Sequence, residues 1–203
     1  MFTHIRAASL TLQGVLQRSF QADPDLNALF GSTAIVSLAT PDGMETANES
    51  GLSMWLYRLI RDEQTLNRPA RRIAPNLIRR HPLPVRLHYL MTPIISGTAG
   101  VPTPETEQLI IGRVLQTFHD EPLISGTDLA GSYAGSGVEL AVRLETLGLD
   151  ETSRIWEGLE RSYQLSVSYE VSVVVVASDL APIAVTPVSI VQPQYAIGAP
   201  GPP

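Results

Sequence analysis

Residues 163–178 read YQLSVSYEVSVVVVAS, and this stretch decides the fold. Apolar side chains occupy every second position from Leu165 to Ala177, and Ser or Glu fills most positions between them. This period of two predicts a β-strand that is buried on one face. From Val173 to Val176 both faces are apolar, so the second half is expected mid-sheet or under a second layer, a neighbouring subunit included. The predicted buried face consists of Leu165, Val167, Tyr169, Val171, Val173, Val175 and Ala177.

The residues just before this strand predict a short helix. Residues 149–159 read LDETSRIWEGL. Asp150 and Glu151 lie in its first turn, where the helix macrodipole favours negative charge. A short helix is therefore expected directly before the long strand.

Two longer helices are predicted elsewhere in the chain. Apolar residues recur at helical spacing over residues 3–20, with Thr3 as the expected cap. The run Thr103-Pro104-Glu105 is typical of a helix start, because Ser/Thr caps, Pro at the first helical position and early acids all favour one. Pro122 limits this second helix. A loop is expected just before it, over residues 96–102.

Four further segments have strand patterns, at residues 33–39, 52–60, 85–94 and 138–144. We expect residues 52–60 and 85–94 to pair, and residues 126–137, with four Gly and two Ser, to form an irregular connection. The expected fold class is α+β, or mixed α/β. It has a mixed sheet of about five strands, with two or three helices forming one layer on one sheet face.

Composition predicts a single domain without cysteine or lysine chemistry. The chain has 203 residues, is 44% hydrophobic and has no low-complexity linker. It has no Cys, and all fourteen basic residues are Arg, which excludes thiolate chemistry, Walker-type phosphate loops and Schiff-base sites. No apolar run approaches the ~20 residues of a membrane span, so direct membrane insertion is not expected. A signal peptide is not expected either, since Gln13 and Gly14 interrupt the first apolar stretch.

The last segment of the chain is predicted to be an extended arm. Prolines space its Val, Ile and Ala residues, which permits an edge strand and excludes a helix. We therefore divide the chain into a domain at residues 1–180 and a Pro-rich arm at residues 181–203. The apolar residues of the arm proposed as interface are Ile183, Val185, Val188 and Ile190.

Charge is distributed unevenly along the chain. Residues 58–86 contain eight Arg against two acids, whereas the rest of the chain contains six Arg against eighteen acids. Prolines within the basic segment predict a loop without regular structure, which is either a solvated loop or a docking loop for acidic protein surfaces. Nucleic acid is not expected, because the chain is acidic overall and no aromatic residues interleave with the arginines. The candidate interface arginines are Arg68, Arg71, Arg72, Arg79 and Arg80.

Residue patterns typical of catalysis are missing from the sequence. The four His share no short spacing, and His119 is explained by its place at a helix C-terminus. The Gly-rich run at residues 131–137 lacks the spacing of a nucleophile elbow or a dinucleotide turn. Trp55, Tyr57 and Trp156 either line a ligand groove or belong to the core. We therefore predict no catalytic, cofactor or metal site, and a chain that is not an enzyme.

The order of several segments resembles a known family. The carrying segments are residues 54–58 (MWLYR), 87–92 (LHYLMT), 112–120 (GRVLQTFHD) and the helix and strand at 149–178. In this order they resemble the tube-terminator or cap family of bacterial contractile injection systems, which are phage-tail-like particles. The resemblance extends from the first predicted helix to about Val191.

The resemblance implies a structural role. A family member is expected to form a ring, a hexamer, on the distal end of the inner tube, and to end assembly of tube and sheath. Its partners would be other copies of itself, the tube protein and the sheath protein. Assembly would take place in the bacterial cytoplasm, within a particle that is either released or anchored. The alternative from the residues is a small-ligand or peptide-binding module that recognises acidic partners through Trp55, Tyr57 and the arginines.

Overall fold

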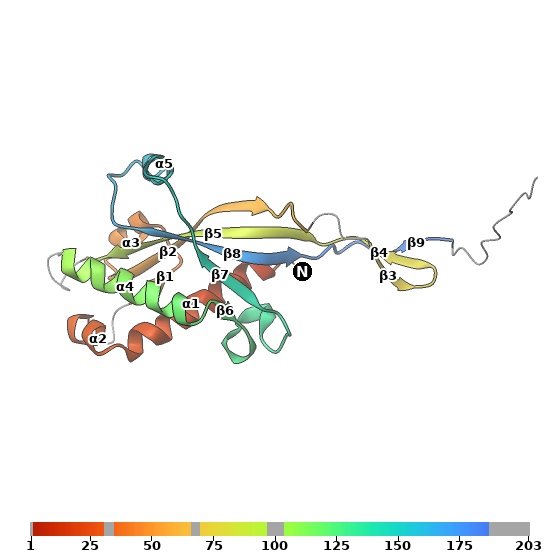
Figure 1. The fold of residues 1–203 in the computed structure, drawn as a ribbon, viewed down its shortest axis with the longest axis horizontal. Helices are drawn as coiled ribbons and strands as arrows, with labels where there is room; N and C mark the ends of the chain where they lie inside the picture. The colour runs from red at the N-terminus through yellow and green to blue at the C-terminus, as the bar shows by residue number, and fades with distance from the viewer. Residues whose placement is uncertain (1, 31–34, 66–69, 97–103, 187–203) are drawn as a thin grey trace, which may run out of the picture.

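The computed structural model describes residues 2–30, 35–65, 70–96 and 104–186. Its centre is a six-stranded sheet with strand order β1-β2-β5-β8-β7-β6 (Figure 1). Strands β1 and β2 are parallel, and the remaining neighbours are antiparallel. The predicted α+β fold with a mixed sheet is confirmed, with one strand more than expected. The strands are β1 (Ile35–Ser37), β2 (Gly51–Arg61), β5 (Leu83–Ile94), β6 (Leu123–Ile124), β7 (Leu140–Leu144) and β8 (Val167–Val176).

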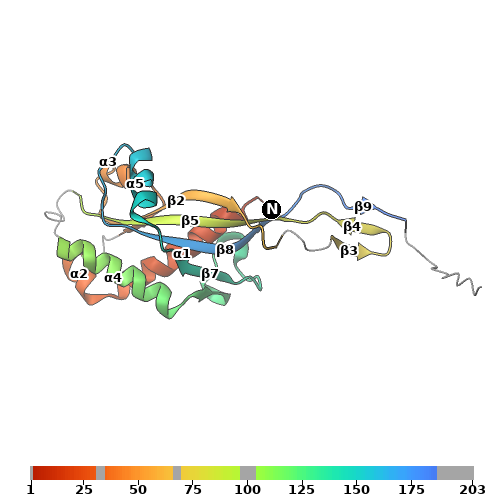
Figure 2. The same ribbon diagram turned by 45° about the horizontal axis from the view of Figure 1, so that its top comes forward.

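Helices lie on both sides of this sheet. One side carries α1 (His4–Ala22), α2 (Pro24–Phe30) and α4 (Pro104–Asp120), which form the predicted layer (Figure 1). The opposite side carries α3 (Pro41–Thr46) and α5 (Leu149–Gly158) (Figure 2). Within the described ranges, no helix is long and apolar enough to cross a lipid bilayer.

Helices α1 and α4 form where the sequence predicts them. The buried side of α1 repeats at helical spacing through Leu12, Leu16 and Phe20. Thr3 occupies the predicted N-cap position, where its carbonyl accepts from the Ala7 N–H at 3.0 Å, but its side chain makes no capping hydrogen bond. Helix α4 begins at Pro104 as predicted, while Thr103 and residues 97–102 lie outside the described ranges.

The core lies between the sheet and the layer of α1 and α4. The Phe118 ring of α4 packs on Tyr169 of β8, with ring centroids 5.0 Å apart. The Tyr89 hydroxyl of β5 is 2.8 Å from the hydroxyl of Ser9 on α1. Residues 126–137 form the predicted irregular connection, which contains two short 3-10 turns and buries Tyr133.

Three buried tyrosines give this core a spectroscopic signature. Burial raises the pKa of Tyr89, Tyr133 and Tyr169 to about 12, from an ordinary value of 10.0. We expect these three of the six tyrosines to ionise last in a titration followed by phenolate absorbance. Because the unfolded chain ionises first, their contribution to stability is complete below pH 10 and is lost between pH 10 and about 12. Ionisation of all the tyrosines in one step near pH 10 would contradict this packing.

Strand β8 departs from the predicted alternation at a β-bulge. Leu87 of β5 pairs with Val171, but Val85 pairs with Val174, so β8 holds one extra residue between these pairs. The core side of the strand therefore changes from odd to even positions, and Val174 is fully buried. The prediction that Val175 and Ala177 share the buried face is wrong, since Val175 is half-buried and Ala177 is exposed.

The surroundings of β8 also refine the prediction. On the side away from α1, Ser168 and Ser172 are buried as well, so the first half of the strand is covered on both faces. Strand β7 pairs with residues 169–172 only. The second half lies beside α1, where the His4 ring nitrogen Nδ1 is 2.6 Å from the Val175 carbonyl oxygen. Helix α1 therefore covers the core side of this half, and cover on the opposite side, where Val175 is half-buried, stays a prediction.

A small second sheet projects beyond the end of β2 and β5 (Figures 1 and 2). Its strands are β3 (Arg71–Ala74), β4 (Leu77–Arg79) and β9 (Ile183–Ala184), in the order β3-β4-β9. The prediction that prolines prevent regular structure here is wrong. Pro75 lies at the turn between β3 and β4, a position where a fixed φ and a missing N–H cost nothing.

Candidate assembly surface

The small projecting sheet brings together two segments that the sequence marked separately. The arginine segment supplies the hairpin β3–β4, and the predicted arm supplies β9. Of the candidate interface residues, Arg68, Val188 and Ile190 lie outside the described ranges. The others are Arg71, Arg72, Arg79, Arg80, Ile183 and Val185, and all of them lie in or beside this sheet.

Strand β9 is attached to the hairpin by a short register. Ile183 pairs with Ile78 and Ala184 with Leu77, and the Val185 N–H donates to the Asn76 carbonyl at 2.8 Å. The predicted edge strand is therefore present, and its outer side has no strand partner in the described part of the chain. The Ile183 side chain remains 45% exposed. An apolar edge strand of this kind is a site where another chain can add a strand.

Two arginines of the hairpin lie opposite each other on its two strands. Arg71 and Arg79 are direct cross-strand partners, and Arg71, Arg72, Arg79 and Arg80 are all exposed. The Arg72 guanidinium donates to the Pro75 carbonyl at 3.1 Å. Within the described ranges, none of the four forms an ion pair with a carboxylate.

A hollow of about 520 Å³ opens where the hairpin and the end of β8 meet. Cationic side chains form one part of its wall and apolar side chains another. It is lined by Arg71, Arg79, Arg80, His81, Pro82, Val175, Ala177 and Ser178.

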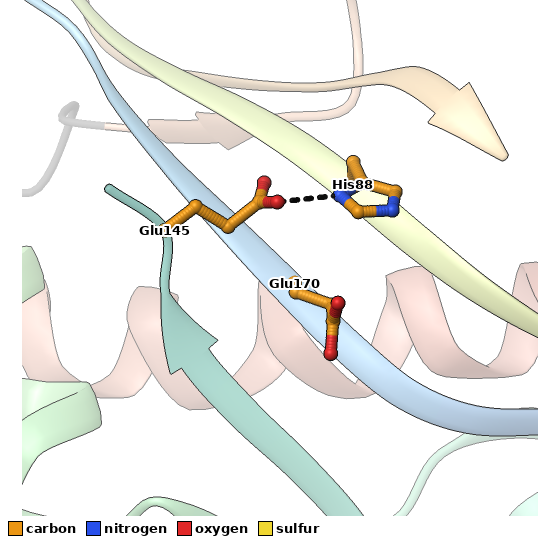
Figure 3. A group of neighbouring side chains, drawn as sticks. All are labelled: His88, Glu145 and Glu170. Atoms are coloured by element: carbon orange, nitrogen blue, oxygen red, sulfur yellow. Dashed lines mark hydrogen bonds and ion pairs between the residues drawn. The ribbon is translucent and has the colours of Figure 1, made fainter. Parts of the chain in front are cut away.

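A different polar cluster is buried under the α5 side of the main sheet, away from this surface. The His88 Nδ1 atom is 2.8 Å from a carboxylate oxygen of Glu145, as the dashed line in Figure 3 marks. The other oxygen of Glu145 accepts from Ser168 at 2.6 Å. The Tyr57 hydroxyl is 3.1 Å from the Ser168 hydroxyl, and burial is the main cause that raises the pKa of Tyr57.

Arg86 joins the same cluster to a buried acid. Its guanidinium lies 2.8 Å from Asp62 and 3.1 Å from Glu170. Asp62 is only 1% exposed. A hydrogen bond from Thr65, together with the Arg86 guanidinium, lowers the pKa of Asp62 below its usual value. The two acids in turn raise the pKa of Arg86.

His88, Glu145 and Glu170 place ligand atoms within 4.8 Å of one another, so they are a possible metal-binding group (Figure 3). The surrounding contacts favour a hydrogen-bonded network instead. Glu170 already accepts from Arg86 through both oxygens, and Glu145 accepts from His88 and Ser168. A cation would have to compete with the Arg86 guanidinium for Glu170. Sequence reasoning missed this cluster because its members are far apart in the chain.

The fold does not bring together the residues of the alternative function, a binding module for acidic partners. Trp55 and Tyr57 line a groove of about 430 Å³ beside α5, which also involves Arg58 and Arg154. The hollow beside the hairpin has a separate lining, with no residue in common. Trp156 is buried and its indole N–H donates to Ser166 at 3.3 Å, so it is a packing residue. The aromatic residues and the described interface arginines therefore do not form one site.

Comparisons with known proteins agree with the resemblance. A solved chain of the sheath/tube terminator of an extracellular contractile injection system (PVC), in its extended state, is 18% identical, with a TM-score of 0.55. That alignment covers 86% of this chain and 61% of the solved chain. The tube-terminating cap of the anti-feeding prophage is 15% identical, with a TM-score of 0.53 and coverage of 84% and 58%. At these identities the likeness establishes the fold.

The present chain spans about three fifths of the length of these two solved chains. No curated protein matches it. The family model described as the Pvc16 N-terminal domain matches residues 7–190. As the ordered segments predicted, the chain has the fold of these two terminator chains, and it belongs to the Pvc16 N-terminal domain family.

Proposed function

We propose that the chain is a structural subunit that ends tube and sheath assembly in a contractile injection system. The observation that carries the proposal is the family match over residues 7–190, together with the fold shared with a sheath/tube terminator and a tube-terminating cap. Its copies form a closed ring, a hexamer, on the distal end of the inner tube. The chain assembles in the bacterial cytoplasm and becomes part of a phage-tail-like particle.

The physical logic is that of a chain stopper. A tube grows because each ring presents one face that fits the next ring, a heterologous contact that does not close along the axis. A terminator matches the growing end on one face and presents a non-matching face outward. Such a role requires binding surfaces rather than chemistry, so we propose that the chain is not an enzyme.

Within this proposal, residues 1–180 are the ring-forming domain and residues 181–203 are an assembly arm. The projecting sheet β3-β4-β9 is the main candidate for contact with a neighbouring subunit, tube or sheath. It is supported by exposed arginines without carboxylate partners in the described part of the chain, and by the open edge of β9. Size-exclusion chromatography with light scattering tests the ring. A strict monomer that also fails to co-elute with tube protein would contradict it.

Charge reversal on the hairpin is expected to weaken assembly without unfolding the subunit. Each exposed ion pair is worth about 0.2–1 kcal/mol, so Arg71→Glu with Arg72→Glu should weaken assembly by roughly tenfold. The subunit should stay folded, because a Glu at position 71 would face Arg79 and relieve their repulsion. The assembled fraction is measured by light scattering at several salt concentrations. The loss should be larger at low salt, where the charges are less screened.

The control for this variant is Arg6→Glu with Arg58→Glu, which changes the net charge equally. Arg6 and Arg58 are exposed on α1 and β2, outside the hairpin, and neither is the cross-strand partner of an acid. We expect this control to assemble like the unmodified chain. Unchanged assembly of the hairpin variant at low salt would instead support a solvated hairpin without a docking role.

A further inference from the structure

The pairing of Arg71 with Arg79 is electrostatically unfavourable in an isolated subunit. Direct cross-strand partners in an antiparallel hairpin have side chains on the same face, and like charges there are destabilising. Arg80 and His81 line the same hollow as this pair. None of the three arginines forms an ion pair in the described part of the chain. In the described part of the chain the hollow thus gathers positive charge, which an anion from outside the subunit would neutralise.

The apolar part of the wall indicates which kind of anion fits the hollow. Pro82, Val175 and Ala177 give the hollow an apolar side. Its volume of about 520 Å³ holds several side chains rather than a single small ion. A protein segment with carboxylates next to an apolar side chain fits both parts of the wall. Arg is suited to such carboxylates because its planar guanidinium binds them through two parallel hydrogen bonds.

Helix α5 carries a surface of this composition. Asp150, Glu157 and Glu160 are exposed on the helix and just after it, and these three acids outnumber the exposed Arg154 on the same helix. Leu149, at the start of the helix, is 72% exposed and provides the apolar side chain. Glu151 is excluded from this set because its carboxylate accepts the Gly148 N–H at 3.1 Å at the helix start.

We propose that the arginine hollow of one subunit receives the acidic surface of α5 from a second copy of the chain. The two surfaces lie toward opposite ends of the molecule, so one copy cannot satisfy itself (Figures 1 and 2). Such a contact is heterologous, and repeated around an axis it closes into a ring. Charge favours a second copy as occupant: residues 58–86 carry a surplus of six positive charges and the rest a surplus of twelve negative charges. The inference rests on the proposed ring and names its subunit contact.

Complementary variants of the full chain test the contact. The hairpin variant is Arg79→Glu with Arg80→Glu, and the helix variant is Asp150→Arg with Glu157→Arg. Each variant alone places like charges across the contact, so its apparent association constant should fall by at least about a hundredfold. Mixed in equal amounts, they should form rings again, because each hairpin then meets an α5 of opposite charge. Light scattering and negative-stain microscopy report the rings, and thermal melts confirm that each variant is folded.

The outcomes separate this inference from the function on which it rests. Recovery of rings in the mixture, with neither variant assembling alone, is the expected result. A hairpin variant that still forms rings but no longer caps tubes would overturn the inference and assign the hollow to the tube protein, leaving the ring intact. A mixture that stays monomeric would also overturn it. If the unmodified chain forms no ring even with tube protein, the proposed function fails, and the inference with it.

Discussion

Deletion of residues 181–203 is expected to leave a folded domain that no longer forms rings or caps tubes. In the described ranges the hydrophobic core extends no further along the chain than Val176, and β9 pairs with the projecting hairpin through two residue pairs. In the described part of the arm Val185 is half-buried and Ile183 is exposed, so the free energy of unfolding should change by about 1 kcal/mol or less. Assembly should be lost because strand addition to a neighbour needs the arm.

The deletion is tested by a thermal melt together with light scattering in the presence of tube protein. A chain that ends at Gln194 keeps most of the arm and serves as the control, with assembly retained. Failure of the deletion variant to melt cooperatively would show that the arm belongs to the subunit core. Normal capping by the folded deletion variant would show that the arm is dispensable.

The Arg86→Met substitution is expected to cost about 3–5 kcal/mol of unfolding free energy, because it leaves a buried carboxylate without its cation. Asp62 is 1% exposed, and Arg86 is its ion-pair partner at 2.8 Å. Glu170, which also contacts Arg86, loses its cation at the same time. Chemical denaturation of the folded chain measures the effect. Arg58→Met, on the exposed part of β2, is the control and should change stability by about 0.5 kcal/mol or less.

The same pair predicts an acid-dependent loss of stability. Because the pKa of Asp62 is lowered in the folded state, its contribution is present above the ordinary value of 3.8 and is lost as pH falls through the lowered value. The double variant Asp62→Leu/Arg86→Met removes both charges and should recover part of the stability lost by Arg86→Met alone. Equal stability of Arg86→Met and the unmodified chain would show that the pair makes no net contribution.

Most elements of this fold are readable from periodicity. The amphipathic spacing of residues 3–20 predicts α1, and the Pro-Glu start with Pro122 as limit predicts α4. The pairing of β2 with β5 follows from two long apolar segments joined by a polar one. These predictions succeed because each depends on the pattern of one segment, which the buried face of the element imposes directly on the sequence.

Features that depend on contacts between distant segments were not predictable in this way. In the Val173–Val176 run every position is valine, so the sequence cannot show where the β8 bulge changes the buried side. Prolines predict a break in regular structure, so the sequence does not reveal the hairpin β3–β4, in which Pro75 lies at the turn. The cluster of His88, Glu145 and Glu170 forms only when β5, β7 and β8 are aligned side by side.

The central claim is that this chain closes the end of a growing tube, and microscopy of the assembled components tests it most directly. The full chain is mixed with its tube protein during tube assembly and imaged by negative stain. The account predicts closed rings seated at one end of each tube, with tube growth stopped at that end. Tubes that grow to the same length with or without the chain, and carry no ring at either end, would contradict it.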